Sequence, residues 1–271
     1  PMLKASAKEG RSQAAYPQTG TWIVMAPSLE KSATERFQQL SGLSDWLSSF
    51  SVVLQAIVST PLESSVYLLL LSLEELNRVN SLSGLVQTMA LLYITRKVVQ
   101  LSYLEIVPSA KQFPLLLPAS PIERMASVTG LWLIGSTYFS LFLVVPGIWF
   151  AIASCLAQQF VVLEGTRMIA AIDKSRALTK GNIGTITKYL CIWPSLAAVM
   201  LLGATMGINA LLDFYNSASY VATTVHIAGA VCLTAIGLAT QVMATRIFVH
   251  LMHKSGRSTA IEKKIAQQQA V

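Results

Sequence analysis

The stretch YLCIWPSLAAVMLLGATMGINALL, residues 189–212, contains no charged side chain. A helix needs about 20 predominantly apolar residues to cross the hydrocarbon core of a bilayer, and this stretch is long enough. After a short loop comes YVATTVHIAGAVCLTAIGLATQVMATRIFV, residues 220–249, in which Arg246 is the only Lys, Arg, Asp or Glu. Together the two stretches predict a pair of membrane-spanning helices. Small residues recur in both, and they allow helices to pack closely within a membrane.

The composition of the whole chain agrees with this interpretation. Of its 271 residues, 53% are hydrophobic and only 12% are charged, whereas soluble domains carry roughly 25% charged residues. The formal net charge of +7 does not indicate a nucleic-acid partner, because the basic residues are scattered between apolar blocks. We therefore expect an integral membrane protein whose partners are membrane lipids and other subunits.

Four further apolar segments precede this pair, at residues 51–73, 82–101, 126–145 and 148–163. Pro61 and Glu63 interrupt the first segment, and Arg96 and Lys97 shorten the second, so these two either span the membrane or lie at its interface. We predict an all-α fold, a polytopic transmembrane helical bundle of about six spans.

The distribution of basic residues predicts the orientation of this bundle. If there are six spans, every Lys and Arg except Arg78 falls on the same side of the membrane. Short loops on the inner side of a membrane carry an excess of Lys and Arg. Both termini are therefore predicted on the positive face, which is the inside, the matrix or the stroma.

The predicted domains are an N-terminal extension (1–50), a transmembrane helical domain (51–249) and a basic C-terminal tail (250–271). Apolar residues spaced three and four apart predict an amphipathic helix from Leu29 to Phe50. The first 25 residues carry Lys4, Lys8 and Arg11 against a single acid, Glu9, and such basic, acid-poor stretches are typical of organellar targeting regions. This favours the mitochondrial inner membrane, with a thylakoid or bacterial inner membrane as alternatives.

Pro146 and Gly147 lie between two apolar segments and predict the turn of a tight helical hairpin. Proline has a fixed φ, and glycine tolerates a positive φ, so that the chain can reverse within a few residues.

The polar segment 164–181 predicts a short interfacial helix. Its basic side is expected to contact anionic headgroups such as those of cardiolipin, through Arg167, Lys174, Arg176 and Lys180. Alternatively, these charges only set the topology. We interpret Glu164, Ser175 and Gly181 as structural residues, with Glu164 holding Ser175 or the basic helix against the end of the bundle.

This region also carries a family resemblance. Its order of motifs is Val145-Pro146-Gly147-Ile148, an apolar segment, Leu163-Glu164-Gly165, then Ala170, Lys174-Ser175, Leu178 and Lys180-Gly181-Asn182. The order resembles the membrane domain found ahead of some glycerophosphodiester phosphodiesterases and in many bacterial inner-membrane proteins. The resemblance implies six helices. It does not imply the enzymatic activity, because the soluble phosphodiesterase part with its acidic metal ligands is absent.

No motif for catalysis or metal binding is found in the sequence. There is no phosphate-binding glycine loop, nucleophile elbow or zinc-hydrolase helix motif, and His250 and His253 have no neighbouring Cys or carboxylate. We expect no enzyme, no metal and no cofactor other than structural phospholipid. Glu63 is a candidate for an ion relay or a structural hydrogen bond. His226 is a candidate for a tetrapyrrole ligand or a hydrogen bond between helices.

Three functions are consistent with these features. The first is a non-catalytic accessory or structural subunit of a larger membrane complex, which we favour because amphipathic termini flank the helical core. The second is a stand-alone protein of membrane homeostasis or lipid handling. The third is a transporter, which requires a water-accessible cavity near Glu63.

Overall fold

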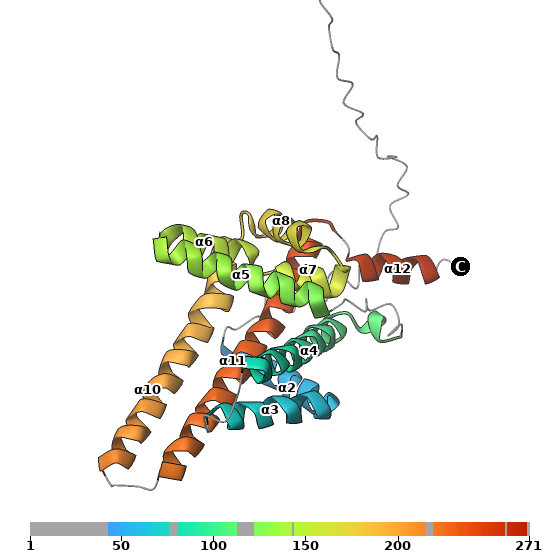
Figure 1. Cartoon of the computed structure of the whole chain (residues 1–271). Helices are drawn as coiled ribbons and strands as arrows, with labels where there is room; N and C mark the ends of the chain where they lie inside the picture. Colours follow the sequence, from blue (N-terminus) through green and yellow to red (C-terminus); the bar gives the residue numbers. More distant parts are fainter. Residues whose placement is uncertain are drawn as a thin grey trace, which may run out of the picture.

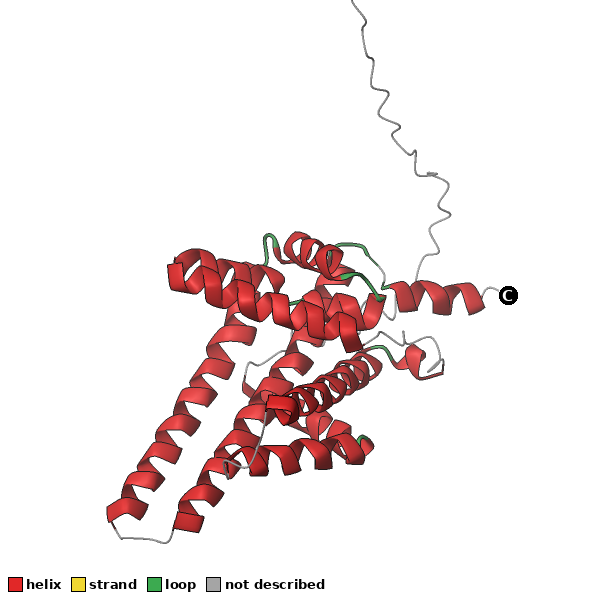
Figure 2. Ribbon diagram, in the orientation of Figure 1, coloured by secondary structure: helices red, strands yellow, loops and turns green. Residues whose placement is uncertain are grey.

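The computed structural model describes residues 43–75, 81–112, 122–142, 144–214, 219–257 and 259–269. Throughout these ranges the regular structure is helical (Figure 2). The prediction of an all-α fold is therefore confirmed for the part of the chain that is described.

The longest elements come from the most apolar sequences. The helices are α2 (Leu43–Ser59), α3 (Pro61–Glu75), α4 (Ser81–Ile106), α5 (Ile122–Phe142), α6 (Val144–Ser154), α7 (Ala157–Glu164), α8 (Met168–Thr179), α9 (Ile183–Ile186), α10 (Trp193–Phe214), α11 (Ser219–Lys254) and α12 (Ala260–Gln269). A 3₁₀ turn, η1 (Pro108–Gln112), follows α4, and a π-helical turn, η3 (Thr187–Ile192), joins α9 to α10.

Helices α10 and α11 form a long hairpin and run side by side (Figure 1). Pro194 is the second residue of α10. A proline inside a helix has no N–H to donate and its ring collides with the carbonyl of the preceding turn, which accounts for the wider π-helical turn immediately before it. At the basic end of the hairpin, Lys254 Nζ donates to Asn182 Oδ1 at 3.1 Å.

Three helical stretches are long and apolar enough to cross a membrane, namely Val145–Glu164, Ile183–Leu212 and Tyr220–Lys254. A fourth is obtained if Ser44–Ser59 and Pro61–Leu73 are counted as one broken span. The chain thus has the helices of a multi-spanning membrane protein, as predicted. The predicted number of six is not confirmed by these candidate spans among the described residues.

The segment predicted as a first span, residues 51–73, is not one straight helix. It is divided between α2 and α3, which meet at a bend of 99°. Pro61 is the first residue of α3. A backbone N–H at this position has no acceptor within the helix, so proline, which lacks the N–H, is tolerated there. Glu63 lies in the same first turn, where a carboxylate is stabilised by the positive end of the helix dipole.

Neither predicted domain boundary lies between elements, because α2 continues through residue 50 and α11 through residue 249. Of the predicted Leu29–Phe50 helix, residues 43–50 belong to α2, and the residues before 43 lie outside the described part. The segment predicted at 82–101 lies within α4, where Arg96 and Lys97 are half-buried.

Pro146 and Gly147 do not form a turn, so this prediction is wrong in detail. The hairpin exists, since α5 and α6 lie side by side (Figure 1). However, α5 ends at Phe142 and α6 already begins at Val144, so both residues are in the first turn of α6. Proline is compatible with this turn because its backbone nitrogen has no helical acceptor there.

The core surrounds the C-terminal half of α11. Met243, Ile247 and Phe248 of α11 are fully buried, and the ring of Phe248 meets that of Phe160 in α7 edge to face, with centroids 4.8 Å apart. From α4, Ser102 Oγ donates to the carbonyl of Val242 at 3.3 Å. In Figure 1, α5 and α6 run across one end of the α10–α11 hairpin. Helix α11 passes through the core, whereas α10 lies beside the core.

Candidate functional site

Ser175 bridges the break between α6 and α7. Its hydroxyl donates to the carbonyl of Ala153 at 2.9 Å and accepts from the backbone N–H of Leu156 at 3.2 Å. Ser175 and Leu156 are both fully buried. A buried backbone group without a partner is costly, so Ser175 replaces the helical hydrogen bonds that the break interrupts.

Glu164 ends α7 and holds the basic helix α8. Its Oε2 accepts from Lys174 Nζ at 2.9 Å. The following Gly165 has φ of 65°, which is the left-handed conformation that favours glycine at a helix end. The carbonyl of Gly165 accepts from Arg124 Nη1 of α5 at 2.9 Å. The sequence left open whether Glu164 contacts Ser175 or the basic helix, and the structure places it against the basic helix.

Gly181 turns the chain out of α8 and into α9. Its φ is 87°, and a Cβ there would meet nothing within 4 Å. Glycine is therefore required by the backbone conformation and not by lack of space. The next residue, Asn182, is the acceptor for Lys254 described above.

The four basic residues predicted to bind lipid are not equivalent. Lys174 is paired with Glu164, and its Nζ lies 5.7 Å from the centre of the Phe160 ring. The guanidinium of Arg176 lies 5.3 Å from the centre of the Phe150 ring. Arg167 and Lys180 flank the two ends of α8 and are exposed. An anionic headgroup at α8 would thus meet Arg167 and Lys180, while two of the predicted residues already have partners within the chain.

The predicted basic tail and α4 together form a polar cluster that was not predicted from the sequence. We call it the C-terminal clasp: Tyr103, His253, Thr259 and Glu262. Glu262 Oε2 accepts from the N–H of Thr259 at 2.7 Å, and the N–H of Glu262 donates to Thr259 Oγ1 at 3.2 Å. This is a capping box at the start of α12. The Thr-x-x-Glu spacing of Thr259 and Glu262 is the sequence signal from which this capping box could have been predicted.

The remaining contacts of the clasp join α12 to the bundle. His253 Nε2 lies 2.8 Å from Glu262 Oε1, and the Tyr103 hydroxyl lies 2.7 Å from Thr259 Oγ1. Tyr103 and Thr259 are fully buried. Burial raises the pKa of Tyr103 above its ordinary value, and the charge of Glu262 raises it further, so the phenol stays protonated.

Arg246, the one charge in the last predicted span, is also engaged within the chain. Its Nη1 donates to the carbonyl of Asp45 and to Ser48 Oγ, both at 3.0 Å, and its Nη2 lies 3.2 Å from Glu105 Oε2. Arg246 thus joins α11 to the start of α2 and the end of α4. The pairing of a charge that lies within a candidate span agrees with the cost of leaving a charge unpaired in a membrane.

Groups suited to a metal are not found in the described ranges, where no three His, Cys, Asp or Glu side chains gather. The described Cys155, Cys191 and Cys232 are free thiols. His226 has a partner on the neighbouring helix, because Asn209 Nδ2 of α10 lies 3.3 Å from its Nε2. Of its two predicted roles, this geometry supports the hydrogen bond between helices.

Comparison with known proteins finds no family model, no curated protein and no solved structure that matches this chain. The resemblance to the membrane domain of phosphodiesterases therefore has no support beyond the motif residues, and we carry no function over from it.

Replacing Ser175 with alanine is expected to lower the free energy of unfolding by about 1–3 kcal/mol, the range for a buried group that loses its hydrogen-bond partner. The N–H of Leu156 would be the group left without an acceptor. Thermal unfolding in mild detergent measures the effect, with the exposed Ser127→Ala in α5 as control. Equal stability of the two variants would contradict the assigned role of Ser175.

Proposed function

We propose that this protein is a non-catalytic subunit of a larger membrane complex in an energy-transducing organelle membrane such as the mitochondrial inner membrane. The observation that carries the proposal is the exposure of α10. None of the most apolar window of Ile183–Leu212 is buried within the chain. Val199, Met200 and Met206 each have more than half of their surface exposed, so α10 adds almost nothing to the protein's own core.

The surface of α10 suits another helix as well as lipid. Gly203 and Gly207 are one turn apart, and a Cβ at either position would meet nothing within 4 Å. Small residues at this spacing let a second helix approach closely in a membrane, where hydrophobicity supplies no net attraction between helices. Complex formation through this face explains why glycine is present where the chain's own packing does not need it.

Membrane lipid is the second partner that we propose. Arg167 and Lys180 are exposed at the two ends of α8, and Lys174 keeps 46% of its side chain exposed although it pairs with Glu164. Each basic residue near an anionic surface contributes about 1 kcal/mol. Structural phospholipid such as cardiolipin fits this arrangement. The same feature supports the second candidate function, a stand-alone lipid-handling protein.

Two alternatives have less support. For a transporter, Glu63 was the candidate relay, but its place in the first turn of α3 gives it a role at the helix start. For an enzyme, the motif residues Glu164, Ser175 and Gly181 already have structural roles, and we propose that they have no catalytic one.

We further propose that both ends of the described chain lie on the positive face of the membrane. The α10–α11 hairpin supports this, because Lys254 at the end of α11 meets Asn182, which precedes α9, at one end of the hairpin. Phe214, the last residue of α10, and Ser219, the first of α11, lie at the other end. Cysteines introduced at positions 216 and 260 are expected to react with a membrane-impermeant reagent from opposite sides. Labelling of both from the same side would contradict this orientation.

Native mass spectrometry of gently extracted protein tests the proposed function. We expect a stoichiometric complex containing this chain and bound anionic phospholipid. The double variant Gly203→Leu/Gly207→Leu is expected to reduce recovery of the complex at least fivefold without changing the thermal stability of the isolated chain. Gly84→Leu in α4, where a Cβ also meets nothing within 4 Å, is the control. A lone monomer from wild-type membranes would favour the stand-alone function instead.

A further inference from the structure

One face of α4 changes from apolar to basic along the helix. Leu85, Val86 and Met89 are exposed near its start. Arg96 and Lys97 follow almost two turns after Met89, and both are half-buried. With 3.6 residues per turn, these five positions lie within about one third of the helix circumference. They therefore form a single surface, which we call the α4 stripe.

The two basic side chains of the α4 stripe have no counter-charge in the part of the chain that is described. Neither Arg96 nor Lys97 makes an ion pair or a hydrogen bond there. The Arg96 guanidinium lies against the ring of Tyr93, with Cζ 6.0 Å from the ring centre. A charge that is partly removed from water costs free energy unless it is paired. An anion bound to the α4 stripe would offset this cost.

The guanidinium of Arg96 suits a phosphate. Its Nε is buried without a hydrogen-bond partner, whereas its two Nη groups are not buried. The accessible edge of the guanidinium therefore carries N–H donors in a fixed planar fork, which matches two oxygens of one phosphate. Lys97, the next residue, supplies a second positive charge and three rotatable donors. Two cations together favour a ligand whose headgroup carries a net negative charge.

The apolar half of the α4 stripe favours a phospholipid over a soluble phosphate. Met89 and Arg96 are seven residues apart, which is about 10 Å along the helix axis at 1.5 Å per residue. A phospholipid joins an acyl chain to a phosphate, so one molecule can cover both halves of the stripe. Inorganic phosphate would contact the basic half alone and leave the apolar half uncovered.

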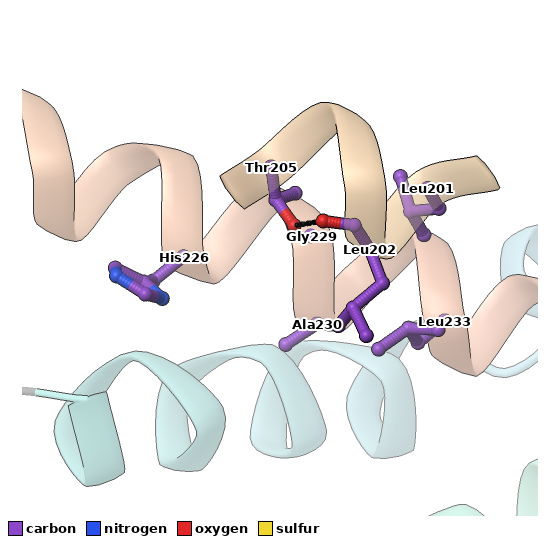
Figure 3. Close-up of a pocket in the computed structure, with 7 residues that line it drawn as sticks. All are labelled: Leu201, Leu202, Thr205, His226, Gly229, Ala230 and Leu233. Atoms are coloured by element: carbon purple, nitrogen blue, oxygen red, sulfur yellow. Dashed lines mark hydrogen bonds between the residues drawn. The ribbon is translucent and has the colours of Figure 1, made fainter. Parts of the chain in front are cut away.

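The surface of the α10–α11 hairpin differs from the α4 stripe. Figure 3 shows the groove between these two helices, which is lined by leucines, Gly229, Ala230, Thr205 and His226. Neither this lining nor the rest of α10 contains a Lys or an Arg. Hydrocarbon can lie on such a surface, but no lysine or arginine of α10 holds a phosphate there. The hairpin therefore serves as a reference surface for lipid without a basic anchor.

We propose that the α4 stripe binds one anionic phospholipid, with the phosphate on Arg96 and Lys97 and an acyl chain along Met89 towards Leu85. A choline headgroup is less suitable, because its own ammonium would lie beside two protein cations and be repelled by them. This site is separate from the basic residues of α8, and the inference does not depend on the proposed role as a subunit.

Photocrosslinking tests which lipid lies on the α4 stripe. Met89 is replaced by p-benzoylphenylalanine in the full chain, in nanodiscs with equal amounts of phosphatidylglycerol and phosphatidylcholine that carry the same acyl chains. Met200, exposed on α10, is replaced in the same way as the control. We expect mass spectrometry to show at least a fivefold preference for phosphatidylglycerol at position 89 and less than twofold at position 200. The same preference at both positions would overturn the proposal.

Variants assign the preference to the two basic residues. Arg96→Gln/Lys97→Gln is expected to lower the preference at position 89 below twofold, whereas Lys111→Gln, exposed in η1, should leave it unchanged. Since neither replaced side chain has a partner among the described residues, the double variant should keep the thermal stability of the wild type in detergent. A preference that survives the double substitution would contradict the assigned site.

A soluble phosphate distinguishes the phospholipid from its headgroup. An excess of glycerol 1-phosphate, which has the phosphate but no acyl chain, is expected to leave the crosslinking at position 89 unchanged. If it abolished the preference for phosphatidylglycerol, the α4 stripe would bind phosphate without using its apolar half, and the proposal of a phospholipid would be wrong.

Discussion

Replacing Glu262 with alanine is expected to release α12 from the bundle and to lower the free energy of unfolding by about 1–3 kcal/mol for each buried group that loses its hydrogen-bond partner. The side chain of Glu262 is 6% exposed and that of His253 is 18% exposed. The substitution removes a partner of His253 and also the acceptor of the Thr259 N–H. Each of these two groups in the C-terminal clasp would then lose one hydrogen bond.

Two further variants separate the parts of the C-terminal clasp. Glu262→Gln keeps an oxygen for the Thr259 N–H and loses only the charge, so we expect a smaller loss than for alanine. Lys263→Ala changes the exposed neighbour and is expected to have almost no effect. Hydrogen exchange of residues 259–269 together with thermal unfolding measures the release. Full protection of α12 in Glu262→Ala would show that the apolar contacts of Ile261 and Ile265 suffice.

The second large effect is expected from Gly135→Ala in α5. A Cβ at Gly135 would lie 2.7 Å from Cε1 and 2.9 Å from Cζ of Phe150, which is closer than carbon atoms can pack. The ring is buried, and Arg176 lies 5.3 Å from its centre on α8. Moving the ring would therefore disturb α8 as well as the α5–α6 hairpin. Overpacking of this kind costs about 1–3 kcal/mol.

Gly130→Ala provides the matched control for this substitution. Gly130 is on the same helix, and a Cβ there would meet nothing within 4 Å. The exchange should therefore show only the better helix propensity of alanine, a gain of up to about 1 kcal/mol. We expect the two variants to shift the melting temperature in opposite directions in mild detergent. A shift in the same direction and of equal size would mean that α5 and α6 are not packed as described.

The sequence predicted well those features that depend on local composition. The long apolar stretches predicted α10 and α11, because their length and apolarity are sufficient to define a span. The positions of proline were harder to interpret. Pro61 divides a predicted span into α2 and α3, whereas Pro146 is accommodated in the first turn of α6. Sequence alone does not distinguish these outcomes, since a proline is equally compatible with a helix start and a turn.

Contacts across long sequence separations account for most of what was missed. Glu164 and Ser175 were predicted to be structural, but the break at Leu156 that Ser175 bridges is visible only in three dimensions. Tyr103 and Thr259 are 156 positions apart, and no local pattern connects them. The Thr259–Glu262 spacing, by contrast, was readable, and it was overlooked because basic residues dominate the tail.

The π-helical turn at Thr187–Ile192 sets the rotation of α10 about its own axis. Such a turn holds one residue more than an α-helical turn. A relative of this protein that lacks one residue here would have a continuous α-helix from Ile183 onward. Its α10 would be rotated by about 100° about its own axis, so Asn209 would no longer face its partner His226 of α11. The insertion or deletion of a single residue at this turn would thus change which side chains of α10 pack against α11.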